Sequence, residues 1–292
     1  MNNFVKLQTN NRTMSKFDFI AHNVNLGDGK FTMDQAKHQP LEETERWKAI
    51  ERSIRLIYNP EELLSARVVD LGCLEGGYSL AFAKMGLQVT GIDAREENLE
   101  KCEWVKSHFN LPNLNYIKDD VKNLGNYEKF DIIFCAGLLY HLDEPSDFIK
   151  LMFKQSNRMT IVHTHYSLEY DSFYDNRRLS FLQKSAKKLF NLPNYHYPQK
   201  YNYRLSDLVE HEGYKGRWFF EFPENTDQKL IESNVAASYS NYKSFWHTKS
   251  ELIRCFRDVG YVSNYEQYDF ISKFTGFDYT EKHDRGMFVL LK

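Results

Sequence analysis

The segment Arg67–Gly77, RVVDLGCLEGG, joins a short apolar strand to a turn that contains three glycines. After it, apolar side chains recur at helical spacing up to Gly86, a typical residue to end a helix. Glycine is favoured in such a turn because the backbone passes close to a ligand and can adopt positive φ. The order strand, glycine turn, helix therefore predicts a ligand site at the C-terminal edge of a parallel sheet.

The same alternation continues along the next hundred residues. Their apolar runs are continuous, which indicates strands that are buried on both faces. We therefore predict an α/β fold with a doubly wound parallel sheet. After the strand at 67–71, the predicted strands are 87–92, 114–117, 130–135 and 158–163.

The flanking segments have different patterns. A helix is predicted over 41–58 and is ended by Asn59-Pro60. A second helix is predicted from Thr248, whose T-x-x-E spacing indicates a capping box, to Gly260. Four segments follow: an N-terminal arm or lid at 1–45, the core at 46–165, a Tyr-rich insertion after the fifth strand at 166–245, and a C-terminal helix with closing strands at 246–292.

Composition indicates a folded protein with near-balanced charge. Of the 292 residues, 42% are hydrophobic and 15% aromatic, and 38 Lys and Arg stand against 40 Asp and Glu. This balance excludes the broad basic field of a dedicated duplex-DNA binder. The four cysteines are far apart, so neither a disulfide framework nor a structural zinc site is expected. With no signal-like start and no long apolar run, we expect a cytoplasmic protein without membrane contact.

Acidic side chains follow the second and third predicted strands. Asp93 ends the second strand in GID, where a carboxylate can accept both hydroxyls of a ribose. Asp119-Asp120 follows the third strand, close to where an adenine amino group would lie. A nicotinamide dinucleotide is the alternative ligand, but Glu75 in the glycine turn would repel a pyrophosphate. A cofactor without phosphates fits these residues better.

These motifs, VVDLGCLEGG, GID, KDD and FDIIFCAGLLYHL, resemble the class I S-adenosylmethionine-dependent methyltransferases in order and spacing. The resemblance covers about 45–165 and 246–292 and implies a seven-stranded Rossmann-like sheet whose last strand is antiparallel. It implies that residues 46–165 bind S-adenosylmethionine. Leu74 stands where the family has the middle glycine of G-x-G-x-G. The implied cofactor-binding residues are Asp70, Gly72, Leu74, Gly76, Asp93, Asp120, Cys135 and Ala136.

Three histidines are candidate catalytic residues. His141 follows the fourth strand, where the turn of related enzymes lies beside the transferable methyl group. A neutral imidazole there can take a proton from an attacking hydroxyl, although transfer by positioning alone is also open. His163 and His165 end the fifth strand and share a face, so they can bind substrate or form a mononuclear metal site with His141. No acidic ligand accompanies them at clear spacing, so we expect no metal.

The acceptor is predicted from the aromatic insertion. Its tyrosines and arginines can cover a small polar molecule, and Trp246 can present an aromatic face to that pocket or pack in the core. RNA is an alternative acceptor, because aromatics alternate with Lys184, Lys187 and Lys188. A noncatalytic binding subunit is a third hypothesis. We predict methyl transfer to a small polar acceptor, most readily at oxygen, and make no prediction of oligomeric state. The insertion residues considered are Tyr166, Tyr170, Tyr174, Tyr195, Tyr197, Tyr201, Tyr203, Arg177, Arg178 and Arg204.

Overall fold

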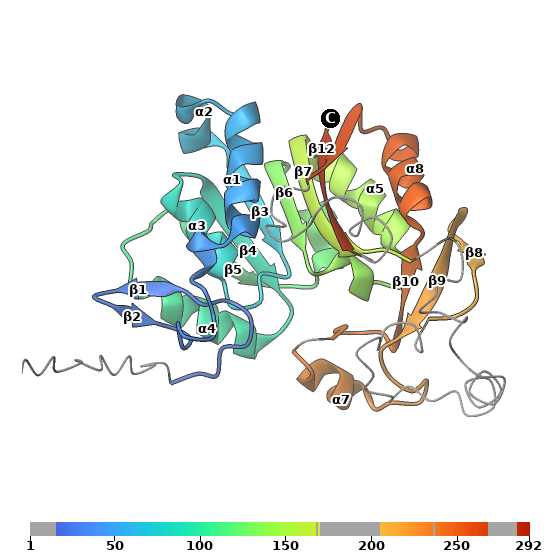
Figure 1. Cartoon of the computed structure of the whole chain (residues 1–292), viewed down its shortest axis with the longest axis horizontal. Helices are drawn as coiled ribbons and strands as arrows, with labels where there is room; N and C mark the ends of the chain where they lie inside the picture. The colour runs from blue at the N-terminus through green and yellow to red at the C-terminus, as the bar shows by residue number, and fades with distance from the viewer. Residues whose placement is uncertain (1–15, 168, 170–204, 236, 268–284) are drawn as a thin grey trace, which may run out of the picture.

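A seven-stranded sheet forms the centre of the computed structural model, in the order β11-β12-β7-β6-β3-β4-β5 (Figure 1). The structure describes residues 16–167, 169, 205–235, 237–267 and 285–292. Neighbouring strands from β7 to β5 are parallel, and β12 is antiparallel to both of its neighbours. This is the predicted doubly wound fold with an antiparallel last strand. The strands are β3 (Arg67–Leu71), β4 (Gln88–Asp93), β5 (Leu114–Lys118), β6 (Phe130–Ala136), β7 (Ser156–His165), β11 (Ser263–Glu266) and β12 (Arg285–Leu291).

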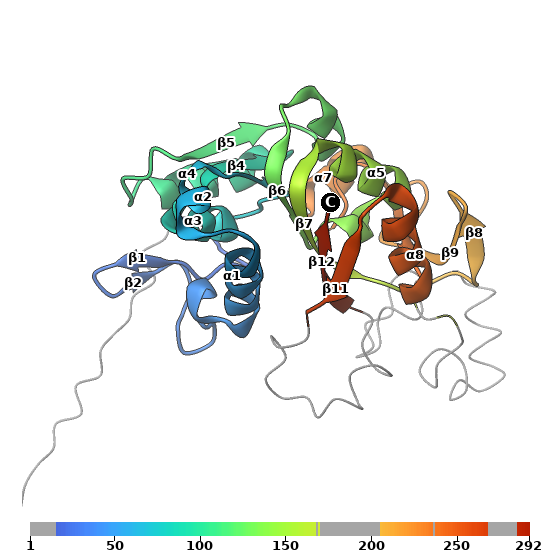
Figure 2. The same cartoon turned by 90° about the horizontal axis from the view of Figure 1, so that it is seen from above.

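Helices cover both faces of this sheet (Figure 2). On one face, α1 (Glu45–Ile57), α3 (Gly77–Lys84) and α4 (Glu96–Lys106) pack against the strands. On the other, α5 (Pro145–Gln155) and α8 (Lys249–Val259) form a second apolar cluster with the 3-10 turn η2 (Val121–Asn126). Buried strands with apolar side chains on both faces require this double cover.

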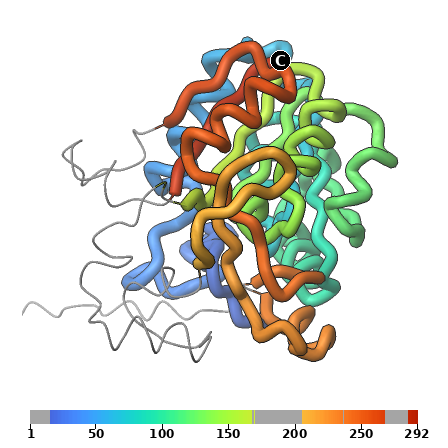
Figure 3. Tube along the Cα trace, turned by 90° about the vertical axis from the view of Figure 1, so that its right-hand side faces the viewer, coloured from blue at the N-terminus to red at the C-terminus, as the bar shows by residue number. Residues whose placement is uncertain are grey.

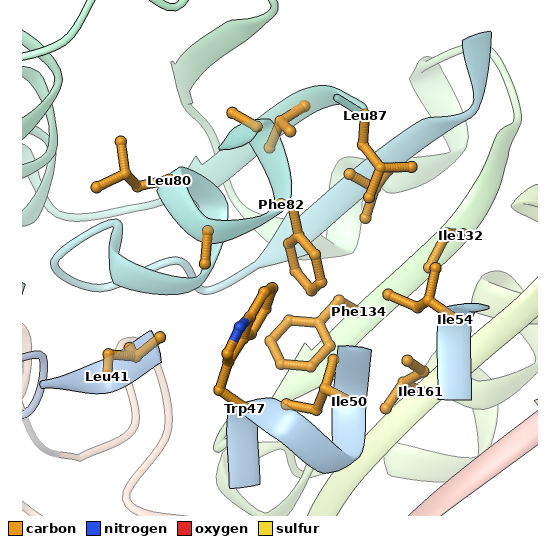
Figure 4. Packing of buried hydrophobic residues seen from close by; sticks show 14 of the residues in the cluster. Leu41, Trp47, Ile50, Ile54, Leu80, Phe82, Leu87, Ile132, Phe134 and Ile161 are labelled. Atoms are coloured by element: carbon orange, nitrogen blue, oxygen red, sulfur yellow. The ribbon is translucent and has the colours of Figure 1, made fainter. Parts of the chain in front are cut away.

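Aromatic rings join α1 and α3 to the sheet, as Figure 4 shows. Trp47, Phe82 and Phe134 come from α1, α3 and β6, and their side chains are almost fully buried. The ring centroids of Phe82 and Phe134 are 5.0 Å apart, and those of Trp47 and Phe82 are 5.2 Å apart. Such offset contacts add to the free energy gained from burying the rings. They fix α1, and with it the chain that precedes it, against this face of the sheet.

Two details of the flanking helices differ from expectation. Asn59 ends α1 as predicted, but it also caps an unpredicted helix α2 (Pro60–Ser65), in a full capping box with Glu62. Proline is well tolerated at the first position of a helix. The predicted capping box at Thr248 is only half present. Its hydroxyl accepts from the Glu251 backbone, but the Glu251 carboxylate accepts from the Lys215 backbone and pairs with Arg254.

Described parts of the insertion form a second, three-stranded sheet beside the core (Figure 3). Its strands are β8 (Val209–His211), β9 (Tyr214–Phe220) and β10 (Lys243–His247), and α7 (Gln228–Ser233) lies between β9 and β10. The Phe245 backbone N–H donates to the Leu142 carbonyl, which ties β10 to the turn after β6. The N-terminal arm contains a hairpin of β1 (Asn25–Gly27) and β2 (Lys30–Phe31). In the described ranges, no helix is long and apolar enough to cross a membrane.

Candidate active site

A cavity of about 730 Å³ lies at the C-terminal edge of the sheet. Its wall is built from the turns after β3, β4, β5 and β6, from the N-terminal arm around His22, and from residues 237–241 of the insertion. The volume is within the range of about 300–1,000 Å³ that is common for small-molecule sites. Of the predicted site residues, it is lined by Asp70, Gly72, Leu74, Asp93, Asp120, Ala136, His141 and His163. Gly76, Cys135 and His165 are not part of this wall.

The turn after β3 keeps left-handed backbone at three positions. The φ angles are 68° at Gly72, 54° at Leu74 and 72° at Gly76. Leu74 holds this conformation although it has a Cβ atom, and its N–H donates to Asp93 Oδ2 at 3.0 Å. Gly76 serves packing, because a Cβ atom there would lie 2.5 Å from the Tyr116 hydroxyl. The replacement of the family's middle glycine by Leu74 therefore does not prevent left-handed backbone at this position of the turn.

Asp93 is held by backbone and side-chain donors at the end of β4. Its Oδ1 accepts from Arg95 N at 2.9 Å and from Asn98 Nδ2 at 3.0 Å. Burial raises the pKa of this carboxyl, and these hydrogen bonds oppose the shift. Asn98 Oδ1, also at the cavity wall, is buried without a hydrogen-bond partner among the described residues. A ligand with hydroxyl or amine donors fits these acceptors.

The adjacent aspartates after β5 have different surroundings. Asp119 accepts from the Tyr127 hydroxyl at 2.6 Å and from Asn123 Nδ2 at 2.7 Å, so its carboxylate is engaged in the local fold. Asp120 caps η2 through Lys122 N and lines the cavity. Of the two, Asp120 is therefore the one whose side chain can meet a ligand.

Asp70 lies at the bottom of the same wall. It is 3% exposed and accepts from the Ser79 hydroxyl at 2.6 Å. Burial, together with the nearby Asp93 charge, raises the pKa of Asp70 to about 7, although the hydrogen bond from Ser79 opposes the shift. A cationic group in the cavity would favour ionised Asp70.

Glu75 points away from the cavity and binds the N-terminal arm. Its carboxylate accepts from the backbone N–H groups of Ile20, Ala21 and His22 at 2.7, 3.1 and 2.8 Å. Glu75 is fully buried and does not line the cavity. Our expectation that it would repel a pyrophosphate was therefore wrong. Instead, the carboxyl groups of Asp70, Asp93 and Asp120, which line the cavity, would oppose a pyrophosphate.

His22 fastens the arm to the helix after the glycine turn. Its Nδ1 accepts from Gly77 N at 3.1 Å, and its ring meets the Tyr78 ring edge-on. Burial lowers the pKa of His22 to about 4, so its imidazole is neutral near pH 7. The arm thus forms a fixed side of the cavity.

His141 forms a hydrogen-bonded pair with Glu221 of the insertion. His141 Nδ1 lies 2.9 Å from one carboxylate oxygen of Glu221 and 3.0 Å from the other. Glu221 also accepts from Ser238 N at 2.8 Å, and Asn241 Nδ2 donates to the His141 carbonyl at 3.0 Å. These contacts fix the imidazole at the cavity wall. The sequence pattern did not reveal Glu221, which is 80 residues away along the chain.

The other two histidines have different positions. His163 lines the cavity, and burial, with the positive charges of Arg285 and Arg46, lowers its pKa well below the usual value. His165 stacks on Trp246, with ring centroids 4.9 Å apart and an interplanar angle of 9°. Among the described residues, no group of three or more His, Cys, Asp or Glu side chains is placed to hold a metal ion.

Arg95 attaches the insertion to the core across the cavity. Its guanidinium donates to the carbonyls of Glu232, Asn234, Ala237 and Ser238 at 2.9–3.1 Å. This contact holds residues 237–241 against the end of β4. Like Glu221, Arg95 was not identified from the sequence. No local pattern indicates that an arginine will bind backbone carbonyls of a distant segment.

Two of the aromatic residues predicted to contact the acceptor, Trp246 and Tyr166, are described by the structure, and neither lines the cavity. Trp246 is 1% exposed, and its indole N–H donates to the Tyr140 carbonyl at 2.8 Å, so it supports the cavity wall from behind. Tyr166 packs in the core beside Phe288. The other predicted insertion residues lie outside the described residues: Tyr170, Tyr174, Tyr195, Tyr197, Tyr201, Tyr203, Arg177, Arg178, Arg204, Lys184, Lys187 and Lys188.

Comparisons with known proteins agree with this architecture. A family model described as a methyltransferase domain matches residues 65–213, about half of the chain. The ubiquinone biosynthesis O-methyltransferase of Rickettsia typhi is 28% identical over 141 residues, 48% of this chain and 54% of that protein. The Proteus mirabilis protein of the same name is 32% identical over 102 residues, 33% of this chain and 41% of that protein. The chain thus spans about half the length of the curated relatives it matches.

Solved structures show the same fold over nearly the whole chain. The N-terminal domain of EvdMO1, solved in the presence of SAH and D-fucose, aligns with a TM-score of 0.59 at 20% sequence identity. The alignment covers 93% of this chain and 90% of that domain. At this level of identity the likeness concerns the fold.

Proposed function

This chain belongs to the methyltransferase domain family, and from that premise we propose that it transfers a methyl group from S-adenosylmethionine to an oxygen of a small polar acceptor. The observation that carries the proposal is that His141, held by Glu221, lines the same cavity as Asp70, Asp93 and Asp120. The matched relatives are named O-methyltransferases, which supports oxygen as the acceptor atom. Four free, buried cysteines suit a cytoplasmic enzyme.

The donor half of the cavity fits S-adenosylmethionine. Asp93 would accept the ribose hydroxyls, with Asn98 Oδ1 as a further acceptor, and Asp120 would accept from the adenine amine. Asp70 and Gly72 would lie beside the methionine portion. When bound, this cofactor supplies an electrophilic methyl group on a cationic sulfur. An acidic wall is compatible with such a cation, whereas it would oppose a dinucleotide phosphate.

His141 is the proposed general base. With Nδ1–H directed at Glu221, its Nε2 is the basic nitrogen and can take the proton of an acceptor hydroxyl. The carboxylate then stabilises the imidazolium that forms. His141 would take the hydroxyl proton while the acceptor oxygen receives the methyl group that the bound cofactor would supply. His163, kept neutral by burial, can hydrogen-bond the acceptor.

The proposal is tested by incubating the full chain with methyl-labelled S-adenosylmethionine and a cell extract that contains both small molecules and RNA. We expect labelled small-molecule product that survives mild alkali and ribonuclease, as an ether does. Alkali-labile label would instead indicate an ester, and label that ribonuclease converts to fragments would indicate RNA. Donor binding without any labelled product would favour a noncatalytic subunit and contradict the proposal.

Asp93→Asn is expected to weaken S-adenosylmethionine binding by roughly 10- to 100-fold, about 1–3 kcal/mol, because a charged acceptor is lost. Its amide would also face the N–H of Leu74, which now donates to Oδ2. Calorimetric titration measures the change. Glu103→Gln on α4, where the side chain is 55% exposed, is the matched control. Equal affinity of both variants would remove Asp93 from the site.

Donor affinity is expected to fall as pH decreases from 8 to 6. The pKa of Asp70 is about 7 in the free protein, so its carboxyl is mostly ionised at pH 8 and mostly protonated at pH 6. Because a bound cation favours the ionised form, the affinity for S-adenosylmethionine should drop by up to about tenfold over this range. Titrations at several pH values measure it, with Asp70→Asn as the variant that should flatten the profile. An affinity that rises toward pH 6 would contradict the assignment.

A further inference from the structure

Charge is distributed unevenly along the cavity, in the order of the strands. At one end, the wall contains Asp70 near the end of β3, Asp93 at the end of β4 and Asp120 after β5. Arg95 and Lys122 also line this end, but Arg95 donates to carbonyls of the insertion and Lys122 pairs with Asp143. At the other end of the cavity, β7 contributes His163 and β12 contributes Arg285, with Arg46 added from the first turn of α1. His141, after β6, lies between the acidic and the basic parts of this edge. The proposed donor occupies the acidic part, so the basic part is left for the acceptor.

Arg285 and Arg46 reach the same region of the cavity. The Arg285 guanidinium lies over the Tyr140 ring, 5.4 Å from its centroid. Arg285 Nη2 also lies close to Gly137, where a Cβ atom would be 3.9 Å from it. Both guanidinium charges act on His163, where they add to burial in lowering the pKa of the imidazole. The two positive charges therefore share one neighbour on the cavity wall.

Nearby carboxylates do not neutralise Arg46. The guanidinium of Arg46 forms no hydrogen bond or ion pair with any residue that the structure describes. Glu45, beside it in the chain, pairs with Lys48 at 2.8 Å. Glu221 is engaged by His141 and Ser238. The guanidinium of Arg46 is thus available to a ligand in the cavity.

We infer that the acceptor carries an oxyanion, a carboxylate or a phosphate, which binds Arg46 and Arg285 while its hydroxyl reaches His141. This inference rests on the proposed function. Guanidinium groups match the geometry of both oxyanions and bind them with charge-assisted hydrogen bonds. The same anion is repelled by the acidic donor half, so the acceptor has a single favourable orientation, with its hydroxyl next to the general base.

The test compares Arg46→Gln, Arg285→Gln and the double variant with Arg55→Gln as control. Arg55 is on the same helix α1 and pairs with Glu51 at 2.8 Å, outside the cavity. Each full-length protein receives methyl-labelled S-adenosylmethionine and small-molecule extract, and products are separated by anion exchange at pH 7. Donor affinity is measured calorimetrically in parallel.

We expect the wild-type product to be retained on the anion exchanger, because methylation of a hydroxyl leaves the oxyanion in place. At low extract concentration the double variant should be slower by roughly 10- to 100-fold and should recover at high concentration, with unchanged donor affinity. Phosphatase treatment that releases the label from the exchanger identifies a phosphate, and persistent retention identifies a carboxylate. Either result supports the oxyanion.

Three results would overturn the inference. Label in the unretained fraction would show a neutral acceptor, or one whose anion had itself been methylated. Equal rates for the double variant and Arg55→Gln would show that the guanidiniums do not bind the acceptor. No label in any fraction, with donor binding intact, would overturn the proposed methyl transfer itself and this inference with it, so the two failures remain distinct.

Discussion

Removing the imidazole of His141 is expected to lower kcat by roughly 100- to 10,000-fold, the usual contribution of a positioned general base. His141→Ala should leave donor affinity nearly unchanged, because the ring belongs to the acceptor side of the wall. The measurement is the initial rate of methyl transfer at saturating donor, beside calorimetry. His108→Ala is the matched control, since His108 is an exposed histidine outside the cavity that contacts the Trp104 carbonyl and ring. A variant that keeps full activity would show that transfer proceeds by positioning alone.

Glu221 acts through His141 and is therefore a positioning residue. Glu221→Gln can still accept one hydrogen bond, but it loses the charge that stabilises the imidazolium. We expect a smaller loss of kcat, about 10- to 100-fold, with the acceptor KM little changed. A purely structural role would instead change the acceptor KM and the free energy of unfolding. Asn241, which holds the His141 carbonyl, offers a comparison within the same network.

The sheet and the acidic part of the cavity wall could be predicted from the sequence because both depend on local patterns. Continuous apolar strands identified the parallel sheet, and Asp70, Asp93 and Asp120 lie at or just beyond the C-terminal ends of three of its strands. Side-chain alternation explains why Cys135 does not line the cavity. Cys135 is fully buried in the second apolar cluster, and Ala136, the next residue, faces the cavity.

Contacts between distant segments could not be predicted in this way. Glu221 meets His141 across 80 residues, and Arg95 meets carbonyls 137 to 143 residues later. A glutamate or arginine in a polar segment has no periodicity that identifies its partner. The same holds for Glu75, which was expected to repel a phosphate from the glycine turn but whose carboxylate binds the arm.

Replacing Glu75 by Ala is expected to cause the largest loss of stability, lowering the free energy of unfolding by roughly 3–5 kcal/mol. Three backbone N–H groups of the arm would lose their acceptor, and Lys101, 3% exposed and 4.0 Å from Glu75, would lose a countercharge. Because Ile20, Ala21 and His22 line the cavity, donor affinity should fall with stability. Urea unfolding and calorimetry measure the two effects.

Glu97→Ala separates the arm contact from the loss of charge near Lys101. Glu97 pairs with the same Lys101 at 3.1 Å, but its side chain is 63% exposed and holds no part of the arm. Because water screens the exposed Glu97 carboxylate, its loss should cost about 0–1 kcal/mol and leave this control close to wild type. Glu75→Gln, which keeps one acceptor oxygen, should fall between the two. Faster amide hydrogen exchange at residues 20–22 in Glu75→Ala would show that the arm has been released, whereas unchanged exchange would mean that the cavity wall holds without Glu75.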